Sequence, residues 1–328
     1  GDRVTHVYCP WELPAAYRRF WRAFDPRLVV ILETELWPNL CAAAKAHGAR
    51  LLLMNGRLSE NSYRGYRRLP KLVRPMLARF DLLAVQTRAE ADRFQALGAD
   101  PERIRVNGSV KFDLTLGESL RDQAAALRQR FAARPVWIAA STHPGEDEPV
   151  LAAHRRLLER HPDALLMLVP RHPERFDEVA GLAARHGMTV ARRSRGDQVD
   201  AAVNLYLADT MGELLMLFGA ADVAFVGGSL VPVGGHNLLE PAAWGVPVLT
   251  GPRLHNFTAI ADLLDRAGAL SRVTDEDALA SRVGALLDDA GERRRLGEAA
   301  AAVVAANRGA LQRGVTICSS LWPSRSGL

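Results

Sequence analysis

The sequence is poor in cysteine and has no long hydrophobic run. Its three cysteines, Cys9, Cys41 and Cys318, form no C-x-x-C pair, so it indicates neither a disulfide framework nor a thiolate metal site, and a reducing compartment is expected. No apolar run approaches the roughly 18 residues that a membrane span requires, and residues 1–10 do not resemble a signal peptide. Any membrane contact of this chain is therefore expected to be peripheral.

Common catalytic and cofactor signatures are missing as well. The nine histidines form no H-x-x-x-H or H-E-x-x-H pair, and no acidic cluster has metal-ligand spacing, so neither a metal nor a cofactor is expected. There is no G-x-S-x-G elbow, no Walker loop and no G-x-G-x-x-G motif that opens a first βα unit. Four histidines each follow a predicted strand and are candidates to line a site or to form hydrogen bonds at helix ends: His143, His172, His236 and His255.

The sequence does contain an alternation of short apolar runs and longer helical patterns. At 328 residues and 48% hydrophobic content, the chain is long enough for two domains. The alternation is typical of βαβ units around a parallel sheet and predicts two doubly wound halves joined near residue 117. Strands are predicted over residues 28–32, 51–55, 82–86, 104–107, 136–141, 165–170, 223–226 and 246–250. Ligands of such sheets bind beyond the carboxyl ends of the strands, where the unusual residues of this chain lie.

The most informative segment is VGGSLVPVGGHNLLEPAA, residues 226–243. Two glycine pairs follow a buried-type strand, and a helix is predicted to begin near His236 or Asn237. A helix N-terminus offers unpaired N–H groups to an anion, so a nucleotide phosphate would fit there. Glu240, one turn into the helix, would then accept hydrogen bonds from ribose hydroxyls. The alternative is that the glycine pairs only make tight turns.

Two further segments follow strands of the second half. In LVPRHP, residues 168–173, Arg171 can form a charge-assisted fork to a phosphate, although pairing with a surface acid is an alternative. In DTMGE, residues 209–213, Asp209 or Thr210 is expected to cap a helix. A capping role for Asp209 or Thr210 would not explain why Gly212 and Glu213 follow.

The first half has its own candidates for chemistry. Glu33 and Glu35 follow the strand at residues 28–32, and strand alternation would point both to one side. Two carboxylates at a sheet edge are candidates for acid-base or charge-stabilising work, with a helix cap and a salt bridge as the alternative. Lys111 follows another strand and is a potential cationic partner, unless it is only solvated.

A basic segment covers residues 57–79, RLSENSYRGYRRLPKLVRPMLAR. Its seven Lys and Arg residues face a single acid, Glu60, and Tyr63 and Tyr66 lie among them. Such a segment suits a phosphorylated lipid or an anionic membrane surface, as does the net charge of +5. No aromatic signature of RNA binding accompanies it, so nucleic acid is not expected. A solvated helical face is the alternative.

Taken in order along the chain, these segments resemble the 3-deoxy-D-manno-octulosonic acid (Kdo) transferase family of lipopolysaccharide synthesis. The matching motifs are ETELWPN (33–39), NGRLSENSYRGYRRLP (55–70), GSVKFD (108–113), ASTHPGEDE (140–148), PRHPERF (170–176), DTMGEL (209–214), GGSLVPVGGHNLLEPAAWGVPVLTGP (227–252) and HNF (255–257).

The resemblance implies a GT-B fold, an α/β fold of two Rossmann-like, doubly wound domains facing a cleft. Residues 1–117 would form a partial acceptor-binding domain, 118–310 a CMP-sugar-binding domain and 311–328 an atypical tail. The resemblance also implies the reaction and its place: inverting transfer of Kdo from CMP-Kdo to lipid IVA, the phosphorylated lipid A precursor, at the cytoplasmic face of the bacterial inner membrane. The residues matched to CMP binding are Pro170, Arg171, Met211, Gly212, Glu213, Asn237, Leu238, Leu239 and Glu240, and those matched to catalysis are Glu33 and Lys111.

The chain departs from the family pattern at both ends. The family has an N-terminal membrane anchor and a Gly-rich segment with the general-base Glu, and neither is found here, so the first domain is expected to be truncated. The ending TICSSLWPSRSGL departs from a helical close. Two alternatives to a transferase stay open: a non-hydrolysing nucleotide-sugar epimerase of the same fold, and a catalytically silent nucleotide-binding fragment.

Overall fold

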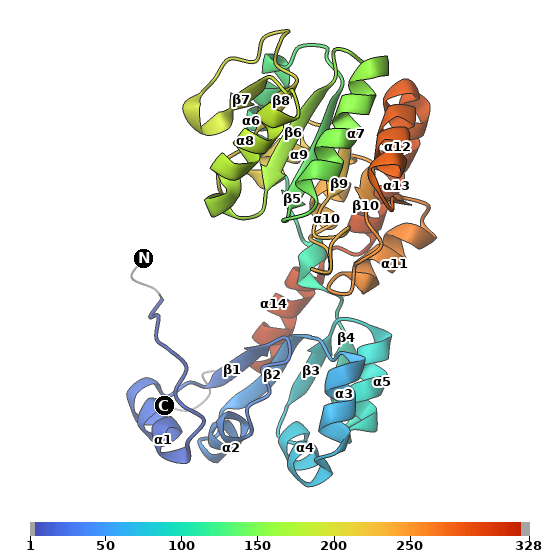
Figure 1. The fold of residues 1–328 in the computed structure, drawn as a ribbon. Coiled ribbons are helices and arrows are strands. Elements are labelled where there is room, and N and C mark those ends of the chain that lie inside the picture. The colour runs from blue at the N-terminus through green and yellow to red at the C-terminus, as the bar shows by residue number, and fades with distance from the viewer. Residues whose placement is uncertain (1–3, 323–328) are drawn as a thin grey trace. The chain divides into compact units, whose positions relative to one another are not determined.

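The computed structural model describes residues 4–322, which fold into two compact units (Figure 1). Unit 1 runs to Asp113 and takes up the chain again from Asn307, whereas unit 2 runs from Leu114 to Ala306. The sequence placed this boundary near residue 117 and assigned the residues up to 310 to the second domain. The difference arises because the last helix of the chain packs on the first unit.

Unit 1 is built on a four-stranded parallel sheet in the order β1-β2-β3-β4. The strands are β1 (Leu28–Leu32), β2 (Arg50–Gly56), β3 (Leu82–Val85) and β4 (Ile104–Val106). The helices before and between them are α1 (Pro14–Phe24), α2 (Pro38–Ala46), α3 (Glu60–Arg67), α4 (Pro70–Leu77) and α5 (Arg88–Ala96). All residues of β2 after Arg50 are buried, which its nearly continuous apolar run predicts for a central parallel strand.

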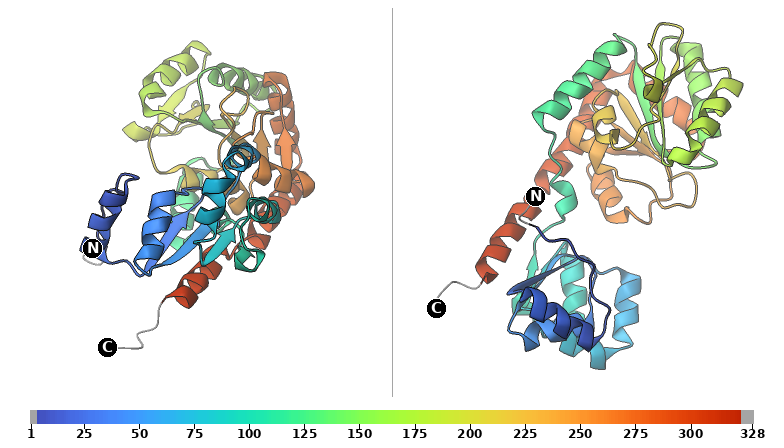
Figure 2. Two further views of the ribbon diagram at one scale, coloured as in Figure 1. Left: turned by 90° about the horizontal axis from the view of Figure 1, so that it is seen from below. Right: turned by 90° about the vertical axis from the view of Figure 1, so that its left-hand side faces the viewer.

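The last described element is a helix, whereas the sequence predicted that the chain would not close on a helix. Helix α14 spans Ala310–Leu321 and lies beside the sheet of unit 1 in both views of Figure 2. Its residues Ile317, Cys318 and Leu321 pack against Leu52, Met54 and Ala84 of the sheet. The Asp113 carboxylate accepts the N–H groups of Gly309 and Leu311, so it satisfies donors at the start of the helix. Residues 323–328, the remainder of that tail, lie outside the described residues.

Unit 2 contains a seven-stranded parallel sheet in the order β11-β10-β9-β5-β6-β8-β7. Its strands are β5 (Val136–Thr142), β6 (Leu165–Pro170), β7 (Val190–Arg192), β8 (Leu205–Leu207), β9 (Val223–Val226), β10 (Val248–Thr250) and β11 (Leu270–Arg272). The strands predicted from the sequence all form. Strands β7, β8 and β11, of three residues each, were not predicted.

Helices cover both faces of this sheet (Figures 1 and 2). They are α6 (Glu118–Arg130), α7 (Asp147–Arg160), α8 (Phe176–Arg185), α9 (Leu214–Phe218), α10 (Leu239–Trp244), α11 (Thr258–Arg266), α12 (Glu276–Asp288) and α13 (Ala290–Ala306). One core cluster includes Val150 and Leu157 of α7, and another includes Ala124 and Leu127 of α6. The doubly wound parallel architecture predicted from the sequence is thus confirmed.

The strand order of unit 2 reverses next to β5. On one side of β5 the sheet continues with β6, β8 and β7, and on the other side it continues with β9, β10 and β11, which follow later in the chain. Open parallel sheets bind ligands at such a reversal, beyond the carboxyl ends of the strands. Among residues 4–322, no helix is both long and apolar enough to span a bilayer.

Candidate functional site

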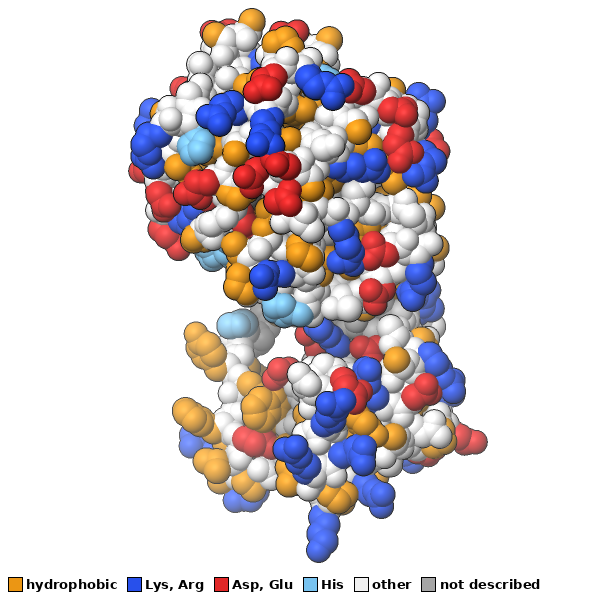
Figure 3. Space-filling view, turned by 45° about the vertical axis from the view of Figure 1, so that its right-hand side comes forward, with side chains coloured by type: hydrophobic (Ala, Val, Ile, Leu, Met, Phe, Trp, Pro, Cys, Tyr) orange, Lys and Arg blue, Asp and Glu red, His pale blue; other side chains and the backbone are white. Residues whose placement is uncertain are grey.

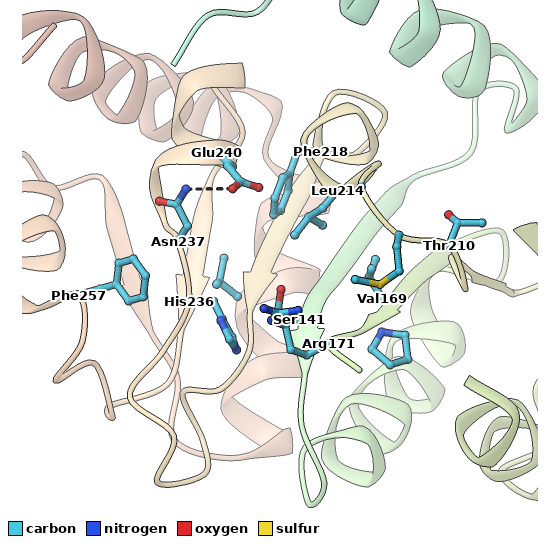
Figure 4. A pocket seen from close by; sticks show the side chains of 14 residues that line it. Ser141, Val169, Arg171, Thr210, Leu214, Phe218, His236, Asn237, Glu240 and Phe257 are labelled. Carbon is cyan, nitrogen blue, oxygen red and sulfur yellow. Dashed lines mark hydrogen bonds between the residues drawn. The ribbon is translucent and has the colours of Figure 1, made fainter. Parts of the chain in front are cut away.

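A cavity of about 330 Å³ opens at the strand reversal of unit 2 (Figure 4). The ends of β5, β6 and β9 form its floor through Ser141, Val169 and Val226. Its other lining residues are Pro170, Arg171, Thr210, Met211, Gly212, Leu214, Phe218, His236, Asn237, Glu240 and Phe257. The site therefore combines an apolar floor and walls with one cation, one carboxyl group and one imidazole, which is the usual make-up of a small-molecule site.

Most of the residues that the sequence matched to a nucleotide lie around this one cavity. Pro170, Arg171, Met211, Gly212, Asn237 and Glu240 all line it. Leu238 and Leu239 do not, because their side chains are fully buried in the core. Glu213 is also absent from the lining, and its carboxylate is bound to an arginine of the neighbouring loop.

Glu240 is oriented by the residue three positions before it. Asn237 donates from Nδ2 to Glu240 Oε1 at 3.0 Å (dashed line in Figure 4), and its Oδ1 accepts the N–H of Leu239 at 3.1 Å. Burial raises the pKa of Glu240, and the Asn237 bond opposes that shift. The cavity therefore holds a partly desolvated carboxyl group that can accept hydrogen bonds from a ligand.

The helix in this segment begins later than predicted. Its first residue is Leu239, not His236 or Asn237. Gly234 and Gly235 have φ of +106° and +78°, and both donate their N–H to the carbonyl of Gly228. The glycines thus close a turn that keeps His236 and Asn237 outside the helix, which is only six residues long.

Gly228, in the first glycine pair, donates its N–H to the carboxylate of Glu146. Glu146 is fully buried. Its Oε2 accepts the N–H groups of Gly228 at 2.6 Å and His143 at 3.0 Å, and its Oε1 accepts those of Ser229 at 3.0 Å and Leu230 at 2.9 Å. Gly227 donates its N–H to the carbonyl of Ala140, and the N–H groups of Gly234 and Gly235 bind Gly228. The N–H groups of both glycine pairs thus have partners within the protein, which favours the alternative that the glycines make tight turns.

Neither Asp209 nor Thr210 caps a helix, contrary to prediction. Asp209 is buried and binds Arg192 Nε at 2.6 Å, while the Thr210 hydroxyl donates to Glu213. Helix α9 begins only at Leu214, so these residues lie too early to cap it. The loop is held by ion pairs instead.

Arg193 is a residue that sequence reasoning missed. It binds Glu213 in bidentate fashion, with Nε to Oε2 at 2.7 Å and Nη2 to Oε1 at 2.6 Å. This pairing lowers the pKa of Glu213 to about 2, so the carboxylate is ionised at neutral pH. The only signal in the sequence was the run ARRSR at residues 191–195, which does not indicate which of its arginines would bind Glu213.

Three histidines that follow strands come together beside the cavity. His143 and His236 meet through their Nε2 atoms at 2.8 Å, and their rings are 8° from parallel. His172 contacts the His143 ring edge-on, with ring centroids 5.1 Å apart. Within residues 4–322, no group of three or more His, Cys, Asp or Glu side chains has an arrangement that could hold a metal ion. His255, the fourth candidate, lies beside Gly234.

In unit 1, Glu33 does not continue the strand as the alternation predicted. Strand β1 ends at Leu32, and Glu33 has φ of +58°, a left-handed conformation that is uncommon for a non-glycine residue. The conformation is fixed because the Glu33 N–H donates to Met54 and its carbonyl accepts from Arg57. The exposed Glu35 instead accepts from Trp37 Nε1 at 3.1 Å. A strained backbone at an exposed carboxylate is typical of functional positions.

The end of β2 connects the loops that carry Glu33 and Lys111. Met54 accepts the N–H of Glu33, and the next residue, buried Asn55, accepts the N–H of Val110 at its Oδ1 at 3.2 Å. Lys111 follows directly, in a 3-10 turn after β4. The two predicted catalytic residues thus lie on neighbouring loops at the carboxyl edge of one sheet.

The basic segment forms α3, α4 and the turn between them. Figure 3 shows Lys and Arg side chains gathered on this face of unit 1 among hydrophobic ones. Six of the seven cations of the segment are exposed: Arg57, Arg64, Arg67, Arg68, Lys71 and Arg74. Leu69 and Leu72 lie among these cations with 55% and 48% of their surface exposed. Arg64 also pairs with Glu60 within α3.

Comparison with known proteins assigns the family. Residues 1–114 match the family model of the 3-deoxy-D-manno-octulosonic-acid transferase (kdotransferase). The 3-deoxy-D-manno-octulosonic acid transferase of Haemophilus influenzae is 42% identical over 95% of this chain and 74% of its own length. That of Bordetella pertussis is 38% identical over 95% of this chain and 73% of its own length.

Solved structures agree with these relatives. The C-terminal CMP-Kdo binding domain of WaaA from Acinetobacter baumannii is 37% identical, with a TM-score of 0.55 over 57% of this chain and 99% of that domain. A UDP-N-acetylglucosamine 2-epimerase from Listeria monocytogenes has a TM-score of 0.61 over 94% of this chain and 77% of its own, but only 16% identity, so it shows the fold alone. By sequence and by fold, the chain belongs to the 3-deoxy-D-manno-octulosonic acid transferase family of glycosyltransferases.

Proposed function

We propose that this protein transfers Kdo from CMP-Kdo to lipid IVA, the phosphorylated lipid A precursor of lipopolysaccharide, with inversion at the sugar. One observation carries the proposal: unit 2 resembles a CMP-Kdo binding domain at 37% identity over 99% of that domain. Six of the nine residues that the sequence matched to the nucleotide line its cavity. The epimerase alternative has support only from distant structures that share the fold.

The cytidine nucleotide is proposed to bind in the cavity of unit 2. Glu240 accepts hydrogen bonds from the ribose hydroxyls, because Asn237 holds its carboxyl group in place and its desolvation favours new partners. Arg171 forms a charge-assisted hydrogen bond to the phosphate. Since the N–H groups of both glycine pairs are bound within the protein, we place the phosphate nearer Arg171 and His236 than the glycine pattern alone suggested.

The chemistry needs stabilisation of two developing charges. As the bond between the Kdo carbon and the phosphate oxygen breaks, positive charge develops on the sugar and negative charge on CMP. We assign Glu33 and Lys111 to the reacting centre, where a carboxylate and an ammonium group can stabilise these opposite charges. Arg171 offsets the charge on the leaving phosphate. The loops that carry Glu33 and Lys111 are held by hydrogen bonds from backbone N–H groups. Such fixed loops suit preorganised electrostatic catalysis.

The acceptor is proposed to reach unit 1 from an anionic membrane surface at the cytoplasmic face of the inner membrane. The exposed cations of α3 and α4 attract phosphate groups of lipids, and Leu69 and Leu72 are placed among them to enter the interface. This combination of exposed leucines and cations favours a membrane over a purely solvated face.

A transfer assay tests the proposal. The protein as the cell makes it is incubated with CMP-Kdo and lipid IVA, and both CMP release and the mass of the lipid are followed. We expect CMP release to depend on the lipid and the lipid to gain one or more Kdo residues. CMP-Kdo turnover that is independent of lipid IVA, or transfer from a uridine nucleotide sugar instead, would contradict the proposed function.

A further inference from the structure

The contact between His143 and His236 is not explained by binding of the nucleotide base or ribose. The Nε2···Nε2 distance of 2.8 Å is that of a hydrogen bond, and both rings are at least half-buried in the loops after β5 and β9. His236 lines the cavity together with Arg171 (Figure 4). The pair therefore connects the wall of the nucleotide cavity to the loop that Glu146 holds.

Two imidazoles that share a hydrogen bond can gain one proton without losing that bond. In the neutral pair, one Nε2 carries the bridging proton and the other accepts it, so the donor ring has a bare Nδ1. A proton added to that Nδ1 gives an imidazolium that still donates to its neutral partner. A second proton would put N–H groups on both Nε2 atoms and break the contact. The pair is thus built to hold either no extra proton or one.

We propose that the His143–His236 pair belongs to the phosphate site and takes up one proton from solvent when the anionic donor binds beside Arg171. The inference rests on the proposed binding of a cytidine nucleotide to this cavity. During transfer, the electron pair of the broken carbon–oxygen bond stays on the phosphate oxygen of CMP. The positive charge of the protonated pair offsets the negative charge that this oxygen gains.

Without a ligand the pair is neutral at physiological pH. Burial lowers the pKa of His236 to about 4, with further lowering by His143, Arg171 and His172. Burial also lowers the pKa of His143, against the opposing charge of Glu146. The charged or titratable groups that face the pair are Glu146, Arg171, His172 and Arg175, and Glu240 lines the same cavity. Two of these neighbours, Arg171 and Arg175, are cations that oppose protonation of the pair, and an anion bound beside Arg171 would favour it.

The test measures proton uptake on binding, with the 328-residue chain and the methyl ester of CMP. The ester is chosen because its phosphate has no second ionisation near neutral pH. Titration calorimetry at pH 6 in two buffers with different ionisation enthalpies gives the number of protons taken up. A phosphate charge raises a neighbouring pKa by roughly 1 to 3 units, so, starting from the pKa of about 4 at His236, we expect uptake of about 0.1 to 0.9 proton per nucleotide at pH 6.

Variants identify the groups that take up the proton. His143→Gln and His236→Gln should each bind the ester with clearly less proton uptake than wild type, because glutamine takes up no proton and leaves only one imidazole of the pair. His172→Gln and Glu240→Gln should still take up the proton. Between pH 8 and pH 5.5, wild-type affinity should rise by up to about 30-fold, because binding raises the pKa of the pair, whereas the affinity of both pair variants should rise less.

The outcomes separate this inference from the proposed function. No binding of the ester by wild type contradicts the assignment of the cavity to a cytidine nucleotide. Binding without proton uptake overturns only the role of the histidine pair. Uptake that stays at the wild-type level in both His143→Gln and His236→Gln, or that is lost in His172→Gln alone, also overturns it, because the proton then resides on another group.

Discussion

Glu146 accepts the backbone N–H of Gly228 at 2.6 Å, so a carboxylate of the protein occupies donors of the glycine loop that would otherwise suit a phosphate. Gly228 in turn accepts the N–H groups of Gly234 and Gly235 through its carbonyl. Glu146 therefore fixes the whole turn between β9 and α10, including the position of His236 on the cavity wall.

The first prediction concerns that carboxylate. Glu146→Gln replaces one acceptor oxygen with an NH₂ group that faces backbone donors, so buried N–H groups lose their partner. We expect a loss of roughly 2 to 5 kcal/mol in the free energy of unfolding and weaker CMP binding. Denaturant unfolding measures the first effect and calorimetry the second. Glu148→Gln, an exposed change on the same helix, is the control and should change stability by less than about 0.5 kcal/mol. Equal stability of the two variants would contradict the role given to Glu146.

The sequence predicted the architecture but not the local geometry of the site. Parallel strands with apolar runs, such as β5 and β6, were readable because burial on both faces leaves a strong pattern. The location of Arg171 and Glu240 followed, since loops at the carboxyl ends of parallel strands meet at one edge.

Three features were not predictable, each for a physical reason. The start of α10 at Leu239 depends on positive φ angles at Gly234 and Gly235, which the residue type allows but does not require. The Arg193–Glu213 pair joins residues 20 positions apart, and no local pattern encodes such a contact. The helical end of the chain depends on packing against β2 and on Asp113, which are distant in sequence.

The second prediction is a pH dependence of stability. His154 is fully buried, its Nδ1 accepts from Trp137 Nε1 at 3.1 Å, and its Nε2 bonds to the carbonyl of Asn204 at 2.8 Å. Burial lowers its pKa from 6.5 to about 4, so between these values the unfolded chain binds a proton that the folded chain does not. The stability that this group contributes is therefore present above about pH 6.5 and is lost as pH falls towards 4.

The size of this effect is on the order of 3 kcal/mol, from a shift of about 2.5 pKa units. Denaturant unfolding at pH 7 and pH 4.5 measures it. A His154→Gln variant should be less stable at pH 7 but should show a shallower pH dependence, whereas His186→Gln at the end of α8 should keep the wild-type slope. An unchanged slope in His154→Gln would assign the pH dependence to other groups, with His236 the next to test.

The third prediction tests the membrane surface of unit 1. Replacing Arg64, Arg67 and Arg68 by Glu should reduce sedimentation with vesicles that contain anionic phospholipid. Each cation near such a surface contributes about 1 kcal/mol, and the loss should shrink as salt screens the charges. Calorimetric affinity for CMP should not change. Equal vesicle binding by wild type and variant at low salt would leave α3 and α4 as an ordinary solvated face.

The fourth prediction separates catalysis from donor binding. In the protein as the cell makes it, Glu33→Gln and Lys111→Met should each lower the turnover number for Kdo transfer by roughly 100-fold or more, while calorimetric affinity for CMP stays within about twofold. Glu35→Gln is the matched control, because this neighbouring exposed carboxylate is bound to Trp37. If Glu35→Gln were as slow as Glu33→Gln, or if both Glu33 and Lys111 variants kept normal turnover, these catalytic assignments would be wrong.

The central claim is that the cavity of unit 2 binds a cytidine nucleotide through Arg171 and Glu240, and titration calorimetry of the 328-residue chain with CMP, UMP and cytidine tests it most directly. The account predicts that CMP binds, that UMP and cytidine each bind at least about tenfold more weakly, and that Glu240→Ala weakens CMP binding by about 1.5 to 3 kcal/mol, or roughly 10- to 150-fold. Equal affinity for CMP and UMP, or unchanged CMP affinity in Glu240→Ala, would contradict it.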